Sequence, residues 1–170
     1  MAQAALLSTK YQTAYLAGGC FWGVEDLIRK QPGVVSTDVG YAGGKTTHPT
    51  YAAVKLGSTG HAEAVKIEFD PSKTSYEKII QYFFRIHDPT TLNRQGNDVG
   101  TQYRSVIFFT DSDQEKIARK VLESVNASGK WKSPVTTGLA PFKEFTLAEN
   151  YHQDYLVKNP QGYTCHFERP

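Results

Sequence analysis

Two spacings of apolar residues divide this chain of 170 residues into strands and helices. Alternation of apolar and polar positions predicts strands over residues 11–17, 34–41, 62–69, 105–110 and 135–137. Helical spacing predicts helices from Cys20 to just before Pro32 and over residues 50–56, 74–86, 112–128 and 146–157. Each of the last three begins with a capping box, in which Ser or Thr precedes Glu by three residues.

The order of these elements indicates the fold class. Strands interleaved with helices fit split βαβ units, so we expect an α/β (α+β) fold, a two-layer sandwich of a mixed β-sheet with helices around a ferredoxin-like core. No repeat or linker divides the chain, so residues 1–170 are expected to form one domain with a core at 15–157. Residues 87–103 form a long polar loop of the kind that is usually functional, and 158–170 a mobile coil tail.

Composition and charge exclude several classes of protein. The net charge is +2 and the basic residues are scattered among acidic ones, which argues against a nucleic-acid partner. No apolar run approaches the roughly 20 residues that span a bilayer, and the N-terminus does not resemble a secretory signal. We therefore expect a soluble cytoplasmic protein with no membrane partner, in which any bond between the two cysteines is transient.

Cys20 follows two glycines and immediately precedes a predicted helix. Backbone N–H groups without partners at a helix N-terminus carry partial positive charge, which is expected to lower the thiol pKa from about 8.5 and favour the nucleophilic thiolate. Phe21 and Trp22 place two aromatic rings beside this sulfur. The alternative is an inert buried cysteine, because free cysteine is commonly a small core residue.

Glu63 lies on the apolar face of the predicted strand 62–69, together with Val65, Ile67 and Phe69. A carboxyl group in an apolar environment has a raised pKa and can donate a proton near neutral pH. The alternative is a solvated residue at the beginning of the strand.

Two tyrosines are candidates to join this carboxyl group. Tyr103 has the same strand parity as Ser105 and Ile107, so it is expected to point into the layer of Glu63, and Tyr51 opens the short helix at 50–56. Two phenols and an acid around a thiolate would polarise and protonate an oxygen while sulfur attacks its neighbour. Taken singly, each tyrosine is more commonly a packing residue.

Cys165 lies in the tail, after a segment with Asn-Pro and Gly that disfavours a helix. A thiol on a movable arm has the properties of a resolving cysteine, which approaches an oxidised first cysteine and forms a disulfide. The alternative is a terminal thiol without a role.

Seven segments in this order resemble the A-type peptide methionine sulfoxide reductases, over residues 15–165. They are GGCFWGVE (18–25), GYAGG (40–44), TGHAE (59–63), HDPT (87–90), NRQGNDVGTQYRS (93–105), YHQDYL (151–156) and NPQGY (159–163). The resemblance implies a catalytic domain that reduces the S epimer of methionine sulfoxide, free or in oxidised proteins, without a metal or organic cofactor. It leaves open which of these substrates is preferred and which reductant acts in the cell; a monomer is expected.

The resemblance also implies roles for individual residues. Cys20 would be the nucleophile, Phe21 and Trp22 the pocket for the substrate methyl group, and Glu63 the acid. Further roles implied are assistance to that acid by Tyr51 and Tyr103, a place near the catalytic sulfur for Asp98, and positions that line or support the site for His152, Tyr155 and Tyr163. Cys165 would resolve the Cys20 sulfenic acid, and thioredoxin would reduce the resulting disulfide.

The chain departs from many members of the family in its tail. Thr164 stands between Tyr163 and Cys165, where others have the cysteine directly after Gly-Tyr, and Phe145-Thr146 replaces a common aromatic pair. Two other classes of function compete with the reductase. One is a Cys-His hydrolase with His61 or His152 as base. The other is a metal-binding module, which would use Cys20, His61, Cys165 and His166.

Overall fold

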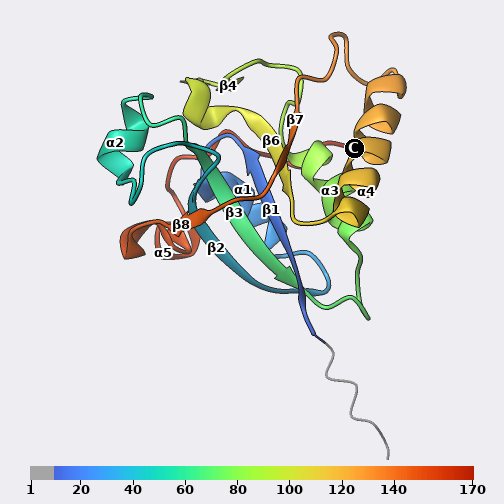
Figure 1. Ribbon diagram of the computed structural model, residues 1–170, viewed down its shortest axis with the longest axis horizontal. Coiled ribbons are helices and arrows are strands. Elements are labelled where there is room, and N and C mark those ends of the chain that lie inside the picture. The colour runs from blue at the N-terminus through green and yellow to red at the C-terminus, as the bar shows by residue number, and fades with distance from the viewer. Residues whose placement is uncertain (1–9) are drawn as a thin grey trace, which may run out of the picture.

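A six-stranded β-sheet lies at the centre of the computed structural model, which describes residues 10–170 (Figure 1). Its strands are β1 (Gln12–Gly18), β2 (Val34–Ala42), β3 (Ala62–Phe69), β6 (Ser105–Phe109), β7 (Gly138–Pro141) and β8 (Phe145–Leu147). They are arranged in the order β7-β6-β1-β3-β2-β8. The pair β6–β7 is parallel and the other neighbours are antiparallel, so the sheet is mixed.

The helices are α1 (Phe21–Ile28), α2 (Tyr51–Lys55), α3 (Tyr76–Ile86), α4 (Ser112–Ala127) and α5 (Tyr155–Lys158), with 3-10 turns η1 (Thr101–Tyr103) and η2 (Asn150–His152). The succession β1-α1-β2-β3-α3-β6 contributes the four central strands in the order β6-β1-β3-β2. Two split βαβ units interlocked in this way form a ferredoxin-like core, which confirms the predicted fold class.

The two faces of the sheet carry different side chains. On one face, Val65, Ile67 and Phe69 of β3 join the main apolar cluster, which includes residues of α1 and α3. On the other face, small residues such as Ala62 and Ala64 pack beneath Phe108 and Phe145. The alternation predicted for β3 is therefore correct, and Glu63 has the parity of the helix-covered face.

The loop 87–103 contains more structure than the sequence indicates. Short strands β4 (Arg94–Gln95) and β5 (Asp98–Val99) pair within it, and η1 follows. Gln95 and Gln102 are buried although the segment is polar. Tyr103 ends η1, so the assumption that it continues the alternation of β6 is wrong.

The capping boxes at Thr74 and Ser112 correctly predict helices α3 and α4, but the residue that caps each helix is a different one. Ser75, and not Thr74, accepts a hydrogen bond from Lys78 N at the start of α3, and Asp111, and not Ser112, caps α4 through Gln114 N. Both errors are shifts of one residue between neighbouring side chains that are all favourable N-caps.

Two predicted elements near the C-terminus are wrong. The helix expected over 146–157 is replaced by β8, η2 and α5, because Gly40 to Ala42 of β2 pair with Leu147 to Phe145. The strand expected at 135–137 begins three residues later, as β7. In both places a partner distant in sequence determines the backbone, and a local pattern does not contain that partner. Within residues 10–170, no helix has both the length and the apolar character needed to cross a bilayer.

Candidate active site

Cys20 occupies the N-cap position of α1, where β1 ends at Gly18 and the chain turns through Gly19 into the helix. Gly19 has φ of 97°, a left-handed conformation that glycine adopts without strain. The thiol is 6% exposed, so it is buried but close to the surface. The structure therefore confirms the predicted place of Cys20 at the start of a helix.

The electrostatic environment of this thiol differs from the expectation. Burial and the neighbouring Glu63 carboxylate raise the pKa of Cys20, and the Trp22 N–H at the helix N-terminus only partly opposes them. The predicted lowering of the pKa is wrong for the protein without substrate, because desolvation of a thiolate outweighs the helix N-terminus. Cys20 is consequently a thiol at neutral pH until a ligand changes its surroundings.

Glu63 lies beside Cys20 because it binds the backbone of the next residue. Phe21 N–H donates a 3.0 Å hydrogen bond to Glu63 Oε2, and the side chain is 2% exposed. Burial raises the pKa of Glu63 to about 8, and the Phe21 bond opposes this in part. The carboxyl group therefore carries a proton at neutral pH, and the solvated alternative is wrong.

This burial predicts a pH-dependent stability. The folded-state pKa of Glu63 lies above its ordinary value, so its favourable contribution is complete below about pH 4.5 and is lost as pH rises through about 8. Glu63→Gln keeps an oxygen acceptor for Phe21 N–H and has no charge to bury. At about 1.4 kcal/mol per pKa unit, the parent should lose several kcal/mol of unfolding free energy relative to this variant between pH 5 and pH 8. Urea unfolding at both pH values checks this, and parallel pH dependences of parent and variant would contradict it.

Tyr51 and Tyr103 flank this carboxyl group. Burial, followed by the charge of Glu63, raises the pKa of Tyr51 to about 12, and the same causes raise the pKa of Tyr103. The charges of Cys20 and Asp98 also contribute to raising the pKa of each phenol, so the five titratable groups interact electrostatically. The tyrosines remain neutral hydrogen-bond donors at physiological pH.

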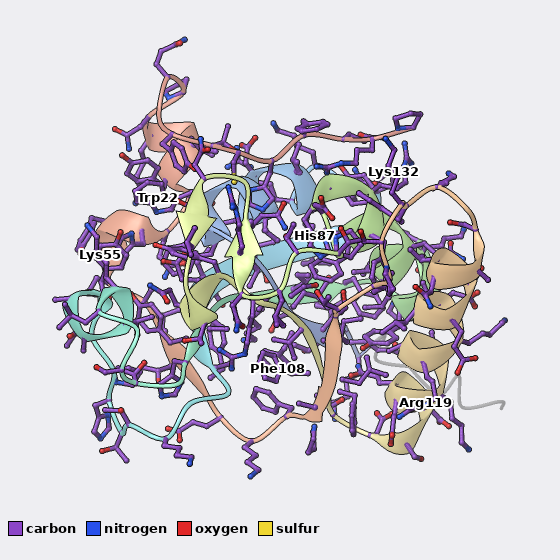
Figure 2. All side chains as sticks on the ribbon, turned by 90° about the horizontal axis from the view of Figure 1, so that it is seen from above. Trp22, Lys55, His87, Phe108, Arg119 and Lys132 are labelled. Carbon is purple, nitrogen blue, oxygen red and sulfur yellow. The ribbon has the colours of Figure 1, made fainter. Side chains whose placement is uncertain are left out.

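An aromatic wall adjoins the thiol, formed by Phe21, Trp22, Tyr155 and His152. The Trp22 ring stacks on Tyr155 with centroids 3.7 Å apart, and its indole N–H donates to His152 Nδ1 at 3.0 Å. Phe21 is 1% exposed and packs against His152, so Trp22 and Tyr155 are the more accessible part of the wall. Figure 2 shows Trp22 near the α5 segment, well away from Arg119 on α4.

His152 contacts other aromatic residues of the wall and of the neighbouring helix α2. Its ring is fully buried and lies 4.3 Å from the Tyr51 ring, measured between centroids. Because Nδ1 accepts from Trp22 and burial lowers the histidine pKa, the proton of the neutral ring is on Nε2. That atom finds no partner among residues 10–170. His152 therefore positions the aromatic rings around the site.

Two supporting carboxylates were missed by the sequence analysis. Glu149 accepts from Tyr41 Oη at 2.8 Å and from Tyr51 N at 3.0 Å, which ties α2 to the segment before η2. Glu25 is 1% exposed and accepts from Thr37 Oγ1 and from Asp154 N, which ties α1 to the segment that carries Tyr155. The spacing from Thr146 predicts Glu149 as a helix-capping residue, and the helical position of Glu25 does not indicate its burial.

The tail brings Cys165 to this region. Its Sγ lies 3.7 Å from Gln95 O and 3.8 Å from Asp98 Oδ2, and Tyr163 Oη donates to the same Asp98 oxygen at 3.1 Å. Burial raises the pKa of Asp98 and of Cys165. Asp98 and Tyr163 thus contact the second cysteine, and both cysteines are free thiols.

The competing functions find no support in this geometry. Both ring nitrogens of His61 bind backbone, Nδ1 accepting from Gly44 N at 3.1 Å and Nε2 lying 2.7 Å from Thr46 O. His152 binds Trp22 and not Cys20. Within residues 10–170, no group of three or more His, Cys, Asp or Glu side chains is arranged to hold a metal ion.

Known proteins of similar sequence and structure cover nearly the whole chain. Residues 12–170 match the model of the family described as peptide methionine sulfoxide reductase. The peptide methionine sulfoxide reductase MsrA of Mycolicibacterium vanbaalenii is 58% identical over 160 residues, which cover 94% of this chain and 92% of that protein. The reduced form of Mxr1 from Saccharomyces cerevisiae matches with a TM-score of 0.89 and 41% identity, over 96% of this chain and 94% of that one. Mxr1 in complex with Trx2 matches with a TM-score of 0.65 and 27% identity, over 96% and 93%.

Proposed function

Since the chain belongs to the peptide methionine sulfoxide reductase family, we propose that Cys20 attacks the sulfur of a methionine S-sulfoxide while Glu63 protonates its oxygen. One observation carries this assignment. The buried Glu63 carboxyl group keeps its proton at neutral pH and accepts a hydrogen bond from the backbone N–H of Phe21, the residue after the buried Cys20. Tyr51 and Tyr103 supply neutral phenol donors for the same oxygen.

The reaction begins from a neutral thiol and a neutral acid. Glu63 gives its proton to the sulfoxide oxygen, which makes the sulfoxide sulfur more electrophilic, and the resulting carboxylate takes the proton that Cys20 loses as the S–S bond forms. The oxygen then passes to Cys20, so that methionine leaves and the cysteine becomes a sulfenic acid. Sulfur of the substrate gains two electrons and sulfur of Cys20 loses two, so no cofactor is required.

The aromatic wall supplies the apolar part of substrate recognition. Trp22, held by Tyr155 and His152, offers a ring face for the substrate methyl group, and Phe21 supports it from the core. The thioether chain of methionine packs well on aromatic rings. Free methionine sulfoxide and oxidised proteins both present this group.

Cys165 completes the cycle by condensing with the sulfenic acid. A disulfide with Cys20 forms and water leaves, after which thioredoxin reduces the disulfide. The match to Mxr1 in complex with Trx2 supports a thioredoxin as the partner, with Asp98 and Tyr163 beside the resolving thiol. Dependence on a thioredoxin favours a reducing compartment, so we assign the protein to the cytoplasm.

The decisive test of the function is turnover of the separated epimers of methionine sulfoxide with thioredoxin or dithiothreitol. We expect methionine from the S epimer only, and no turnover without a dithiol. Cleavage of an acyl substrate without a reductant would instead favour a hydrolase.

Cys165→Ser separates the reductive step from recycling. The variant should release about one methionine per enzyme in a single turnover, because that step needs only Cys20. Sustained turnover with thioredoxin should fail, since no disulfide can form, and dithiothreitol should rescue it in part by attacking the sulfenic acid directly. Methionine release measured in both regimes checks this. Unimpaired thioredoxin-dependent turnover would show that the enzyme works with one cysteine.

A further inference from the structure

The residue after the second cysteine is inserted into the protein core. His166 is 7% exposed, and its Nε2 lies 2.7 Å from the carbonyl oxygen of Gly18, two residues before Cys20. Burial lowers the pKa of His166 to about 4, so the ring is neutral at physiological pH. A carbonyl oxygen only accepts, so the ring proton is on Nε2, and Nδ1 is free to accept from the Cys165 thiol 3.7 Å away.

A glycine of the Cys20 segment, Gly23, leaves room for this ring. A Cβ at Gly23, within α1, would lie 2.4 Å from His166 Nδ1 and 2.5 Å from Thr164 Oγ1. A Cβ at Gly19 would meet the Gln95 side chain first, at 2.5 Å, and His166 Nε2 at 3.2 Å, so Gly23 is the glycine that the ring itself requires. Glycine inside a helix costs about 1 kcal/mol relative to alanine, and the helix itself gives no reason for it. The docked tail supplies that reason.

Thr164, the residue that departs from many relatives, belongs to the same contact. Its Oγ1 accepts from His166 N at 3.1 Å, a local turn that directs the histidine ring toward α1. The additional residue therefore does not displace Cys165 from the region of Asp98.

Beyond His166, the last residues bind α3, beside which Figure 1 places the C-terminus. Arg85 forms an ion pair with Glu168, and its Nε donates to Arg169 O at 3.0 Å. Arg169 N donates in return to Arg85 O at 2.8 Å, and Tyr82 Oη lies 3.4 Å from Glu168 Oε2. We call Arg85, His166, Glu168 and Arg169 the C-terminal clamp.

We propose that the C-terminal clamp positions the resolving thiol, by holding the chain on the far side of Cys165 against the residues that flank Cys20. This inference rests on the proposed role of Cys165. On the near side, Tyr163 binds Asp98, so the segment 163–166 is fixed at both ends and only a local shift brings Cys165 to the sulfenic acid.

The clamp is expected to affect the rate of one step, the formation of the disulfide between Cys165 and the Cys20 sulfenic acid. Fixing both ends of the segment raises the effective concentration of the Cys165 thiol at Cys20, as a short tether does. In the condensation, the Cys165 S–H bond and the Cys20 S–O bond break, the S–S bond forms, and the proton and hydroxide leave as water. Methionine release precedes this step and does not involve the tail.

Two variants weaken the clamp at residues that are neither catalytic groups nor members of the aromatic wall. Arg85→Ala removes the ion pair and the bond to Arg169 O, which are exposed contacts whose loss leaves the fold intact. Gly23→Ala drives a methyl group into the space of the His166 ring while favouring the helix. The control is Arg119→Ala, which removes a comparably exposed ion pair with Glu115 on α4.

The experiment mixes reduced enzyme with one equivalent of methionine sulfoxide, then follows methionine release, free thiols and capture of the sulfenic acid by dimedone. We expect unchanged methionine release in all variants. Disulfide formation should slow several-fold in Arg85→Ala and about tenfold or more in Gly23→Ala, with a longer-lived sulfenic acid, and remain at the parent rate in Arg119→Ala.

Each other result overturns the inference. Unchanged disulfide formation in both variants would mean that the clamp has no positioning role, and faster formation would mean that it restrains Cys165. A parent that releases methionine but forms no disulfide would refute the role of Cys165 itself. A parent that releases none would refute the proposed reduction, so the two failures are distinguishable.

Discussion

Replacement of Cys20 by serine is expected to reduce turnover to below about one per cent of the parent with every reductant, a rise of roughly 2.7 kcal/mol or more in the barrier. A hydroxyl group is a far weaker nucleophile than sulfur and does not form a sulfenic acid. The buried position suits the smaller oxygen without strain, so the fold should persist. Methionine release in a single turnover, with no recycling required, measures this effect directly.

The matched control for this variant is Cys165→Ser, which removes the other thiol of the chain. It should retain the single turnover that Cys20→Ser lacks. If Cys20→Ser kept more than about one per cent of the parent rate, or if Cys165→Ser lost the single turnover, the assignment of the two sulfurs would have to be reversed or abandoned.

The central fold was predictable because its signals are local and strong. The strand 62–69 has the same bounds in sequence and structure, and its alternation placed Glu63 on the helix-covered face. The glycines before Cys20 and the apolar spacing after it predicted the turn into α1. These features depend on periods of two and about 3.6 residues, which the chain carries without reference to distant partners.

The wrong secondary-structure predictions lie where a segment distant in sequence determines the backbone conformation. The capping box at Thr146 predicts a helix, but β2 recruits Phe145 to Leu147 into the sheet, and Glu149 binds Tyr41 and Tyr51. Pairing with β2 gives the backbone N–H and C=O groups of this segment hydrogen-bond partners along its length, whereas a capping side chain would satisfy backbone groups only at the start of a helix. Sequence spacing does not distinguish these two uses of the same residues.

The pKa values of the site residues depend on how deeply each side chain is buried, and the sequence does not determine that burial. Position at a helix N-terminus predicted a lowered pKa for Cys20, whereas enclosure beside Glu63 raises it. For Glu63 the apolar strand mates indicate enclosure and the start of the strand indicates solvation; the structure supports enclosure. His166 shows the limit most clearly: the sequence offers it only as a ligand of a metal-binding module, whereas the structure buries its ring against Gly18 and Gly23.

Glu63→Gln is expected to lower the rate of the reductive step by about two to four orders of magnitude, the usual span for a general acid. The amide preserves shape and can accept the Phe21 N–H bond, but it cannot transfer a proton to the sulfoxide oxygen or take one from Cys20. Tyr51 and Tyr103 remain as hydrogen-bond donors, which is why some activity should persist. Substrate binding should change less, because the aromatic wall is untouched.

The pH dependence provides an independent measure of the same proton. With a pKa of about 8, Glu63 is protonated at neutral pH and loses its proton above pH 8, so the parent single-turnover rate should fall as pH rises through this value. The slow rate of Glu63→Gln should lack this decline. Glu68→Gln, on the other face of the same strand, is the matched control and should follow the parent profile. A near-parent rate for Glu63→Gln in single turnover would contradict the acid role, since recycling cannot mask the step in that measurement, and would leave the phenols of Tyr51 and Tyr103 as the proton donors.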